Sequence, residues 1–257
     1  MKGPRAKVGL GIDIGGTGVK AALVNLANGD LASQRVRLKT PNPSTPAAVA
    51  DTVRQVVETI AKEVALPAEM PVGCGLPGVA RNGRLTTAAN IDKGWLQVSA
   101  DEVIGEALGR TVVIVNDADA AGVAEMRFGA GVGHAGTVLL LTIGTGIGSA
   151  LFSEGRLVRN TEFGHMRFRG VDAEFRISGT ARERSGLSWR QWADEFSLYL
   201  ARIETVLNPD LIILGGGVSK EMAKYVELLH SSAPIVAAHF LNTAGIIGAA
   251  MVAAEVA

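Results

Sequence analysis

The chain has 257 residues, a hydrophobic fraction of 47% and a formal net charge of +0. This length suffices for one large or two modest domains. The balanced charge argues against a protein that coats nucleic acid or lies on a membrane surface, although it leaves room for a local basic groove. The single cysteine, Cys74, excludes an internal disulfide and a site of several cysteines, so a reducing cytoplasm fits.

Two further features bear on the compartment. Only a short apolar strand follows the first seven residues, which predicts that there is no signal peptide. The most apolar run, residues 137–152, is interrupted by glycines and is too short for a membrane span.

The first half of the chain begins with a predicted β-meander. Two apolar strands flank a tight turn at residues 15–18, and a third alternating strand follows a hairpin signal at residues 28–30. Thr45 and Pro46 form a helix start signal, and apolar residues then recur at helical spacing. The predicted elements are strands 8–14, 19–25 and 31–38, helix 46–64, strand 71–76, helix 101–108, strand 111–115 and helix 118–128.

The opening pattern then starts again at residue 137. Each copy consists of a strand, a Gly-Thr-Gly turn, a strand, a glycine turn and a strand, and Ile14 corresponds to Ile143. The repetition predicts an internal duplication; chance similarity between glycine-rich hairpins is the alternative. The later predicted elements are strands 137–143, 149–152 and 156–159, helix 189–207, strand 211–214, a helix after residues 215–220 and helix 244–256.

A duplicated α/β pattern of this kind predicts two domains with a cleft between them. Residues 1–116 are expected to form the N-terminal α/β domain, with the C-terminal helix, about 244–257, packing back on it. Residues 117–243 are expected to form the C-terminal α/β domain. The seam would lie near Asn116 and Asp117.

The glycine loops do not match the two best-known phosphate motifs. The P-loop pattern is absent, and the G-x-G-x-x-G at residues 131–136 precedes a strand instead of linking a strand to a helix. The two Gly-Thr-Gly turns lie between strands, where backbone N–H groups can converge on an anion and Thr17 and Thr145 add hydroxyl donors. Either turn alone would be interpreted as an ordinary hairpin turn, but the pair favours two phosphate clamps.

Asp13 stands near the end of an otherwise apolar strand, where an unpaired carboxylate would be costly. A hydrated Mg²⁺ beside phosphates would offset that cost, because Mg²⁺ keeps its waters and uses one or two carboxylates. A structural aspartate that caps the turn is the alternative.

Asn116 and Asp117 end a buried strand at the proposed seam. Ligands of open α/β sheets bind at the carboxyl ends of strands, and a carboxylate in a dry cleft is a good general base for a hydroxyl. The alternative for Asp117 is a helix N-cap. Asp119 is interpreted as a first-turn acid that favours the helix dipole.

Glu162, His165 and Glu174 lie in a glycine-rich stretch of weak periodicity, and Asn90 lies in another loop. Without partner cysteines they form a weak metal site, but they suit several hydrogen bonds to a polyhydroxylated ligand. Solvated loop charges are the alternative. No Ser-His-Asp or Cys-His arrangement with a recognisable elbow supports acyl transfer, and Cys74 is interpreted as a small core residue.

Five segments carry a family resemblance when they are taken in order. They are DIGGTGVK at 13–20, NDADA at 116–120, LTIGTGIG at 141–148, EFGH at 162–165 and LGGGV at 214–218. The chain resembles the ROK-family sugar kinases, which have the duplicated actin/hexokinase-like (ribonuclease H-like) fold. The segments at 40–46, 88–95 and 116–131 are most similar to the polyphosphate glucokinases within that family, including the polyphosphate/ATP glucomannokinases.

The resemblance implies a role for each matching position. Asp117 would be the base that takes the proton from the sugar 6-hydroxyl, and Asp13 would orient Mg²⁺ through water. The substrate-binding residues would be Asn90, Asn116, Asp117, Glu162, His165 and Glu174. The phosphate- and nucleotide-binding residues would be Asp13, Gly15, Gly16, Thr17, Lys20, Gly144, Thr145, Gly146, Gly215, Gly216 and Gly217, with the last three near the adenosine of ATP.

The chain departs from the family pattern in one respect. Many ROK proteins carry a zinc-binding cysteine cluster after the Glu-x-Gly-His stretch, but residues 167–174 hold none, so no structural zinc is expected. Fewer than ten residues precede the first strand, which removes the DNA-binding role of the ROK repressors.

The implied reaction is phosphoryl transfer from inorganic polyphosphate, ATP or both to the 6-hydroxyl of glucose, with mannose as a second candidate acceptor. A cytoplasmic homodimer is expected from the resemblance. The alternatives are a strictly ATP-dependent ROK hexokinase, an actin-like ATPase without a sugar substrate and a sugar sensor without activity. Lys20, Arg81, Arg84 and Lys93 are candidates for a polyphosphate track, with solvated surface charges as the alternative.

Overall fold

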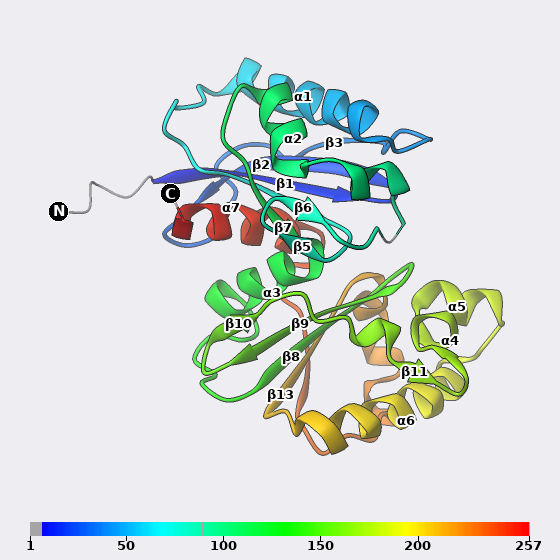
Figure 1. Ribbon diagram of the computed structural model, residues 1–257. Helices are drawn as coiled ribbons and strands as arrows, with labels where there is room; N and C mark the ends of the chain where they lie inside the picture. The colour runs from blue at the N-terminus through cyan, green and yellow to red at the C-terminus, as the bar shows by residue number, and fades with distance from the viewer. Residues whose placement is uncertain (1–6, 89, 257) are drawn as a thin grey trace. The chain divides into compact units, whose positions relative to one another are not determined.

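The structure is a computed structural model that describes residues 7–88 and 90–256 (Figure 1). The chain divides into two compact units, one made of Met1–Ala124 with Thr243–Ala257 and the other of Glu125–Asn242. The division falls after Ala124, inside helix α3 (Asp117–Phe128), whereas the sequence pattern placed it at Asn116. Helix α7 (Ala244–Val256) belongs to the first unit, where it packs on strands β1 and β4.

The sheet of the first unit has the strand order β3-β2-β1-β4-β7. Strands β1, β2 and β3 form an antiparallel meander, and β4 and β7 extend it parallel to β1. Helices α1 and α2 cover one face and α7 covers the other (Figure 1). The bounds are β1 Val8–Gly15, β2 Gly18–Asn25, β3 Val36–Leu38, α1 Pro46–Glu63, β4 Val72–Leu76, α2 Ala100–Leu108 and β7 Val113–Asn116.

Strand β1 has two different faces because its side chains alternate. Leu10, Ile12 and Ile14 are fully buried in the core that includes α1. The opposite face carries glycines, and a Cβ placed on Gly11 would lie 1.9 Å from the carbonyl oxygen of Ile246 in α7. Glycine therefore lets the backbone of α7 lie directly against the sheet.

The sheet of the second unit has the order β10-β9-β8-β13-β14. Helix α6 begins with a capping box formed by Ser188 and Gln191, and its buried aromatic residues pack in the core of this unit. Trp192 stacks on Phe196 at 4.8 Å between ring centroids. The bounds are β8 Val138–Ile143, β9 Ile147–Ser153, β10 Arg156–Val158, α6 Trp189–Leu207, β13 Leu211–Gly215 and β14 Ile235–Ala237.

The two sheets repeat one another. In each, a three-stranded antiparallel meander is followed by two parallel strands. The register repeats as well, because Asp13 pairs with Gly75 in the first sheet and Thr142 pairs with Gly215 in the second. The predicted duplicated α/β fold is confirmed, and Thr142 stands where the first copy has Asp13.

Two predicted elements were wrong in extent or type. The third strand covers only Val36–Leu38, because the hydroxyl of Ser33 accepts the hydrogen bond of the Leu23 amide where backbone pairing was expected. The segment after Gly216 is a 3₁₀ helix, η3 (Gly217–Lys224). There the carbonyl of Val218 accepts a hydrogen bond from the Tyr225 hydroxyl.

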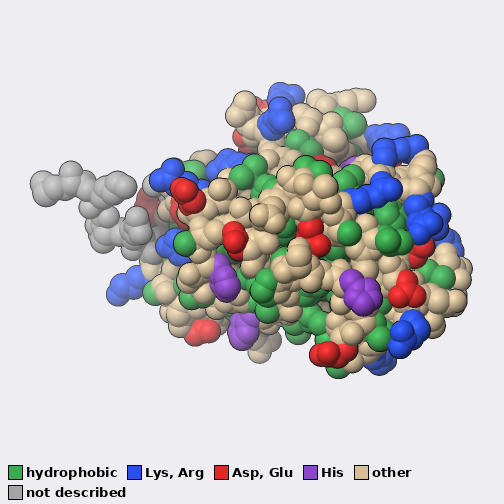
Figure 2. Space-filling model, turned by 90° about the horizontal axis from the view of Figure 1, so that it is seen from below, with side chains coloured by type: hydrophobic (Ala, Val, Ile, Leu, Met, Phe, Trp, Pro, Cys, Tyr) green, Lys and Arg blue, Asp and Glu red, His purple; other side chains and the backbone are tan. Residues whose placement is uncertain are grey.

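Several short elements lack a sequence signal long enough to predict them. They are β5 Ala80–Arg81, β6 Arg84–Leu85, η1 Lys93–Gln97, η2 Phe163–His165, β11 Arg167–Phe168, β12 Val171–Asp172, α4 Glu174–Ile177, α5 Gly179–Arg184, η4 Val226–Leu228, β14 Ile235–Ala237 and η5 Leu241–Thr243. Among the described residues, no helix combines the length and the apolar character that crossing a membrane requires. Both acidic and basic side chains occur on the face drawn in Figure 2, as the balanced composition predicts.

Candidate functional site

The first Gly-Thr-Gly turn links β1 to β2, and its tip, Gly16 and Thr17, is exposed. Its carbonyl oxygens are engaged by neighbouring segments. The hydroxyl of Thr40 donates to the carbonyl of Gly15 at 2.5 Å, and the guanidinium of Arg37 donates to that of Thr17 at 3.0 Å. The turn is therefore held at both ends while its tip faces solvent.

Asp13 is not the unpaired carboxylate that its place in the strand suggested. The ammonium of Lys20, its direct partner across β1 and β2, lies 2.6 Å from Oδ2 of Asp13, whose side chain is only 14% exposed. A Cβ on Gly245, in the first turn of α7, would lie 3.0 Å from the Asp13 carboxyl carbon. The negative charge of Asp13 is thus stabilised by the positive end of the α7 helix dipole as well as by Lys20.

Asn116 ends β7, and Asp117 begins α3. The buried amide of Asn116 donates to the carbonyl of Gly78 at 3.0 Å, and its oxygen accepts from the Asp119 amide at 2.9 Å. Asn116 therefore connects a loop to the start of α3 and caps that helix. The sequence had offered this capping role as the alternative for Asp117. Asp117 is half-buried in the first turn of the helix, and Asp119 is buried there.

The sheet brings Asp13 and Asp117 to the same edge, which is the one formed by the carboxyl ends of the parallel strands β1, β4 and β7. Strand β4 lies between β1 and β7, and the register aligns Asp13 with Gly75 and Gly75 with Val115, so Asp117 lies two residues beyond the position opposite Asp13. The position between them is Gly75, which pairs with Asp13, and a Cβ there would lie 3.6 Å from the Cα of Asp117. Glycine thus places no side chain between the two carboxylates.

Asn90 lies in an exposed loop with a left-handed backbone, φ +58°. A Cβ on Gly16 would lie 3.0 Å from the Asn90 carbonyl oxygen, so this loop borders the first glycine turn. Ser44 fixes the following residues, because its hydroxyl accepts from the Asp92 amide and its carbonyl accepts from the Trp95 indole.

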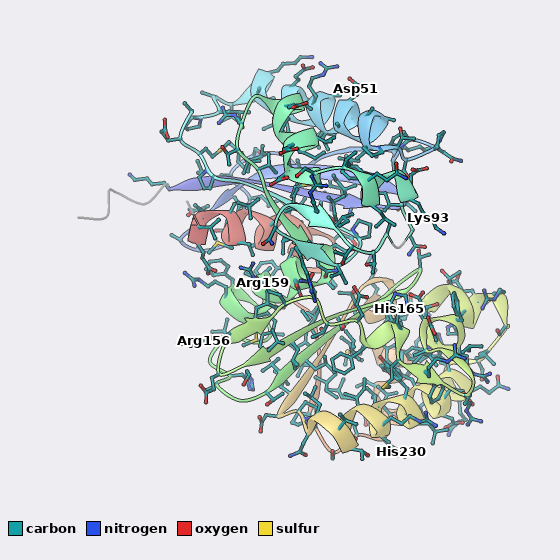
Figure 3. All side chains as sticks on the ribbon, viewed as in Figure 1. Asp51, Lys93, Arg156, Arg159, His165 and His230 are labelled. Atoms are coloured by element: carbon teal, nitrogen blue, oxygen red, sulfur yellow. The ribbon has the colours of Figure 1, made fainter. Side chains whose placement is uncertain are left out.

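The other basic candidates lie at the surface of the same unit. Arg81 and Arg84 face one another in the two-stranded ribbon of β5 and β6. Lys93 begins η1 (Figure 3). All three side chains are exposed.

The residues at this edge fit a hydrated Mg²⁺. One carboxylate, Asp13, lies here beside the ammonium of Lys20, and glycine at position 245 keeps a side chain off it. Mg²⁺ binds with one or two protein carboxylates and retains waters. The described residues hold no group of three or more His, Cys, Asp or Glu side chains arranged to bind a metal ion.

The second glycine turn, in the other unit, links β8 to β9. The amide of Gly144 donates to the carbonyl of Gly146 at 3.0 Å, and the Gly144 carbonyl accepts from the Thr180 amide in α5. Thr145 is exposed at the tip. The turn is therefore closed by its own backbone and by the start of α5.

Gly215 ends β13 beside this turn, and Gly216 and Gly217 follow the strand. Gly216 has φ +79°, and a Cβ there would lie 2.5 Å from the Ile143 carbonyl oxygen, so only glycine fits. Gly215 pairs with Thr142, whereas a Cβ on Gly217 would meet nothing within 4 Å. The segment thus packs tightly against the end of β8 and opens to solvent at Gly217.

Glu162, His165 and Glu174 do come together in the second unit. Nε2 of His165 lies 3.7 Å from Oε2 of Glu162, and Nδ1 lies 4.0 Å from Oε1 of Glu174. Glu174 also accepts from the amide of Ile147, just after the glycine turn, at 3.3 Å. The hydroxyl of Ser149 accepts from the amide of Phe163, which fixes η2 to β9.

Burial raises the pKa of Glu162, the neighbouring His165 opposes that increase, and the charge of Glu174 adds to it. Hydrogen-bond donors on a ligand stabilise the charged form of a carboxylate that burial has removed from water. The cluster therefore suits a neutral ligand with several hydroxyl groups.

Sequence reasoning missed two residues that the structure brings to these clusters. They are Asp172, whose carboxylate contacts His165, and Arg37, which lies over the first glycine turn. It also missed Glu125, whose carboxylate accepts from the amides of His239 and Phe240. Basic and apolar residues alternate through residues 35–39, and this pattern could have pointed to Arg37. Nothing in the local pattern distinguishes Asp172 or Glu125 from surface acids, because their partners are set by tertiary contacts.

The predicted site residues thus form two groups, one in each unit. The first unit brings together Asp13, Gly15, Gly16, Thr17, Lys20, Asn90, Asn116 and Asp117. The second brings together Gly144, Thr145, Gly146, Glu162, His165 and Glu174, with Gly215, Gly216 and Gly217 beside the turn.

The chain is similar to known proteins in sequence and in fold. The profile of the ROK family matches residues 9–177. The polyphosphate glucokinase of Mycobacterium tuberculosis is 46% identical over 244 residues, which cover 95% of this chain and 90% of that protein.

Two solved structures extend the comparison to the fold. The inorganic polyphosphate/ATP-glucomannokinase from Arthrobacter sp. strain KM superposes with a TM-score of 0.94 at 45% identity, covering 98% of this chain and 100% of the other. A ROK family glucokinase from Streptomyces griseus, in complex with glucose and AMPPNP, gives a TM-score of 0.81 at 26% identity, covering 96% and 99%.

Proposed function

Because the chain belongs to the ROK family, we propose that it is a glucokinase that transfers a phosphoryl group from inorganic polyphosphate or ATP to the 6-hydroxyl of glucose. The relatives named above support the acceptor and both donors. We propose mannose as a second acceptor, on the ground that the Arthrobacter relative is described as a glucomannokinase.

The single observation that carries the proposal from this chain is the sheet edge of the first unit. It presents an exposed Gly-Thr turn, a carboxylate at Asp13 and a second carboxylate at Asp117, with Gly75 between them. Phosphoryl transfer depends on positioning and charge neutralisation more than on covalent protein chemistry. A phosphate-binding turn, a metal-orienting carboxylate and a base meet that need.

The roles proposed for these residues follow their chemistry. Asp117 accepts the proton of the attacking hydroxyl, and Asn116 holds the start of α3 so that this carboxylate is fixed. Asp13 would hold a hydrated Mg²⁺, and that ion would supply neutralisation of phosphate charge. The glycine turns bind phosphate through N–H groups and the hydroxyls of Thr17 and Thr145.

The second unit supplies the acceptors for the sugar. Glu162, His165 and Glu174 are proposed to accept or donate hydrogen bonds to its hydroxyls, and Asn90 is proposed as a further substrate-binding residue. Gly215, Gly216 and Gly217 provide the surface for the adenosine when ATP is the donor. The enzyme is proposed to act as a homodimer in the cytoplasm, which size-exclusion chromatography with light scattering and cell fractionation would test.

A donor and acceptor swap tests the function directly. Purified protein is assayed with polyphosphate or ATP as the donor and glucose or mannose as the acceptor, with Mg²⁺ present or removed by EDTA. Hexose 6-phosphate should form with glucose and should stop with EDTA. Phosphorylation of glucose with ATP but not with polyphosphate would favour the strictly ATP-dependent hexokinase. Hydrolysis of the donor at a rate that does not depend on glucose would favour an actin-like ATPase.

The base assignment has its own test. Asp117→Asn should lower kcat by about 10²–10⁴-fold, the range that general-base catalysis contributes, while glucose still raises the melting temperature. Asp51→Asn, on the exposed face of α1 (Figure 3), is the matched control and should retain activity. Near-normal turnover of the Asp117 variant would overturn the assignment.

A further inference from the structure

The imidazole of His165 contacts carboxylates on both sides. Nδ1 lies 3.2 Å from Oδ2 of Asp172, which is within hydrogen-bond distance. Nε2 lies 3.7 Å from Oε2 of Glu162, which is too long for a direct hydrogen bond. The ring is therefore bonded at Nδ1 and open at Nε2.

Asp172 is itself held in place. It stands on β12 directly opposite Arg167 on β11, and the guanidinium of Arg167 lies 3.4 Å from Oδ1 of Asp172. Arg167 also donates to the carbonyl of Gly170 at the tip of the hairpin. One carboxylate oxygen of Asp172 thus faces Arg167 and the other faces His165.

A carboxylate that accepts from Nδ1 fixes the protonation pattern of a neutral imidazole. The proton then resides on Nδ1, and Nε2 carries a lone pair. Beside it stands Glu162, which is also an acceptor when ionised. Two acceptors at 3.7 Å repel each other unless donors occupy the space in front of both.

We propose that Asp172 is a positioning residue that holds the proton of His165 on Nδ1, so that Nε2 and Glu162 form a pair of acceptors for two adjacent hydroxyl groups of the substrate. This deepens the proposed function, on which its kinetic part rests. Neighbouring hydroxyls on a sugar ring can each donate one hydrogen bond, one to Nε2 and one to the Glu162 carboxylate. A deoxy sugar that lacks one of the two hydroxyls leaves one acceptor without a donor.

Nitrogen NMR tests the tautomer without any activity measurement. The chain has four histidines, so the His165 ring signals can be assigned by comparison with His165→Gln. In the wild type at pH 8, the long-range ¹H–¹⁵N pattern should be that of the Nδ1–H tautomer. In Asp172→Asn, whose amide can donate to Nδ1, the pattern should move toward Nε2–H. The wild type in the Nε2–H form would overturn the proposal.

A matched variant separates positioning from folding of the hairpin. Arg167→Gln loosens the same hairpin but keeps the acceptor of Nδ1, so the Nδ1–H pattern should persist. If Arg167→Gln and Asp172→Asn shift the His165 signals equally, Asp172 acts only through the hairpin and the proposal is wrong.

Kinetics test the consequence for the substrate. Asp172→Asn should raise KM for glucose about tenfold, as expected for one hydrogen bond, with kcat changed less than twofold and KM for the phosphate donor unchanged. An unchanged KM for glucose would contradict the acceptor pair. If the wild type phosphorylates no hexose, the proposed function fails, whereas the tautomer assignment is decided independently by the NMR result.

Discussion

The ammonium nitrogen of Lys20 lies 2.6 Å from Oδ2 of Asp13, directly across the hairpin that carries the first glycine turn. The pair places a cation and a proposed metal-orienting carboxylate side by side at the strand ends. Lys20 therefore stabilises the carboxylate in addition to any contact with phosphate.

Replacing Lys20 by methionine should destabilise the first unit. The substitution leaves a mostly buried carboxylate without its cation, which costs about 1–3 kcal/mol of unfolding free energy. Urea unfolding measures the loss, and Asp13→Asn combined with Lys20→Met should recover part of it. Arg54→Met, in the exposed pair with Asp51, is the control and should cost clearly less, because solvent screens exposed ion pairs. Equal losses in the two single variants would contradict the interpretation.

Arg37 should contribute to binding of the phosphate donor. Its guanidinium lies over the first glycine turn, and it stands directly opposite Lys20 on the neighbouring strand, an arrangement of like charges that an anion would relieve. Arg37→Ala should raise KM for polyphosphate several-fold and weaken its dependence on ionic strength, with KM for glucose unchanged. Lys62→Ala, at the end of α1, is the control. An unchanged KM for polyphosphate would exclude this role.

Gly11 should not tolerate a side chain. The Cβ of alanine there would lie 1.9 Å from the carbonyl oxygen of Ile246, so α7 would have to move, at a cost of about 1–3 kcal/mol or more. Gly9→Ala, on the same face of β1, meets Leu26 only at 3.2 Å and should cost less. Thermal melting distinguishes the two. A larger loss for Gly9→Ala would show that α7 is not packed as described.

Glu125 should be more important for stability than its sequence context suggests. Its fully buried carboxylate accepts hydrogen bonds from the amides of Ala130, His239 and Phe240. In Glu125→Gln the bonds to a charged acceptor are lost, so the unfolding free energy should fall by about 3 kcal/mol. Glu58→Gln, which is exposed on α1, should change it by less than about 0.5 kcal/mol. Similar losses of unfolding free energy in the two variants would contradict a stabilising role for the Glu125 carboxylate.

The raised pKa of Glu162 predicts a pH dependence of stability. Its pKa in the folded protein lies above the ordinary value of 4.5, so the folded state keeps this proton after the unfolded state has lost it. The contribution of Glu162 to stability is therefore greatest below pH 4.5 and falls as the pH rises through the folded pKa. Glu162→Gln should lack this decline and melt at a higher temperature than the wild type at pH 7, while binding glucose more weakly. A lower melting temperature at pH 7 would contradict the sign.

The sequence alone determined the duplicated fold and most of the candidate site. Local signals were strong there: alternating apolar residues, glycine turns and the cap at Thr45 are short-range features that do not depend on distant contacts. Asp13 and Asp117 could be placed at strand ends because both follow β-branched, buried runs. The register that pairs Gly75 with Asp13 and with Val115 was not predictable, since it depends on pairing between strands distant in the chain.

The tertiary structure decided the partners of the charged groups. Lys20 neutralises Asp13, Asn116 takes the capping role, and Asp172 binds His165. These contacts join residues whose side chains have many rotamers, and the sequence does not specify which rotamer the packing selects. The same limit explains why Glu125 looked like an ordinary helix residue. Two of its three partners, His239 and Phe240, lie more than 100 residues away in the chain, and only folding brings them together.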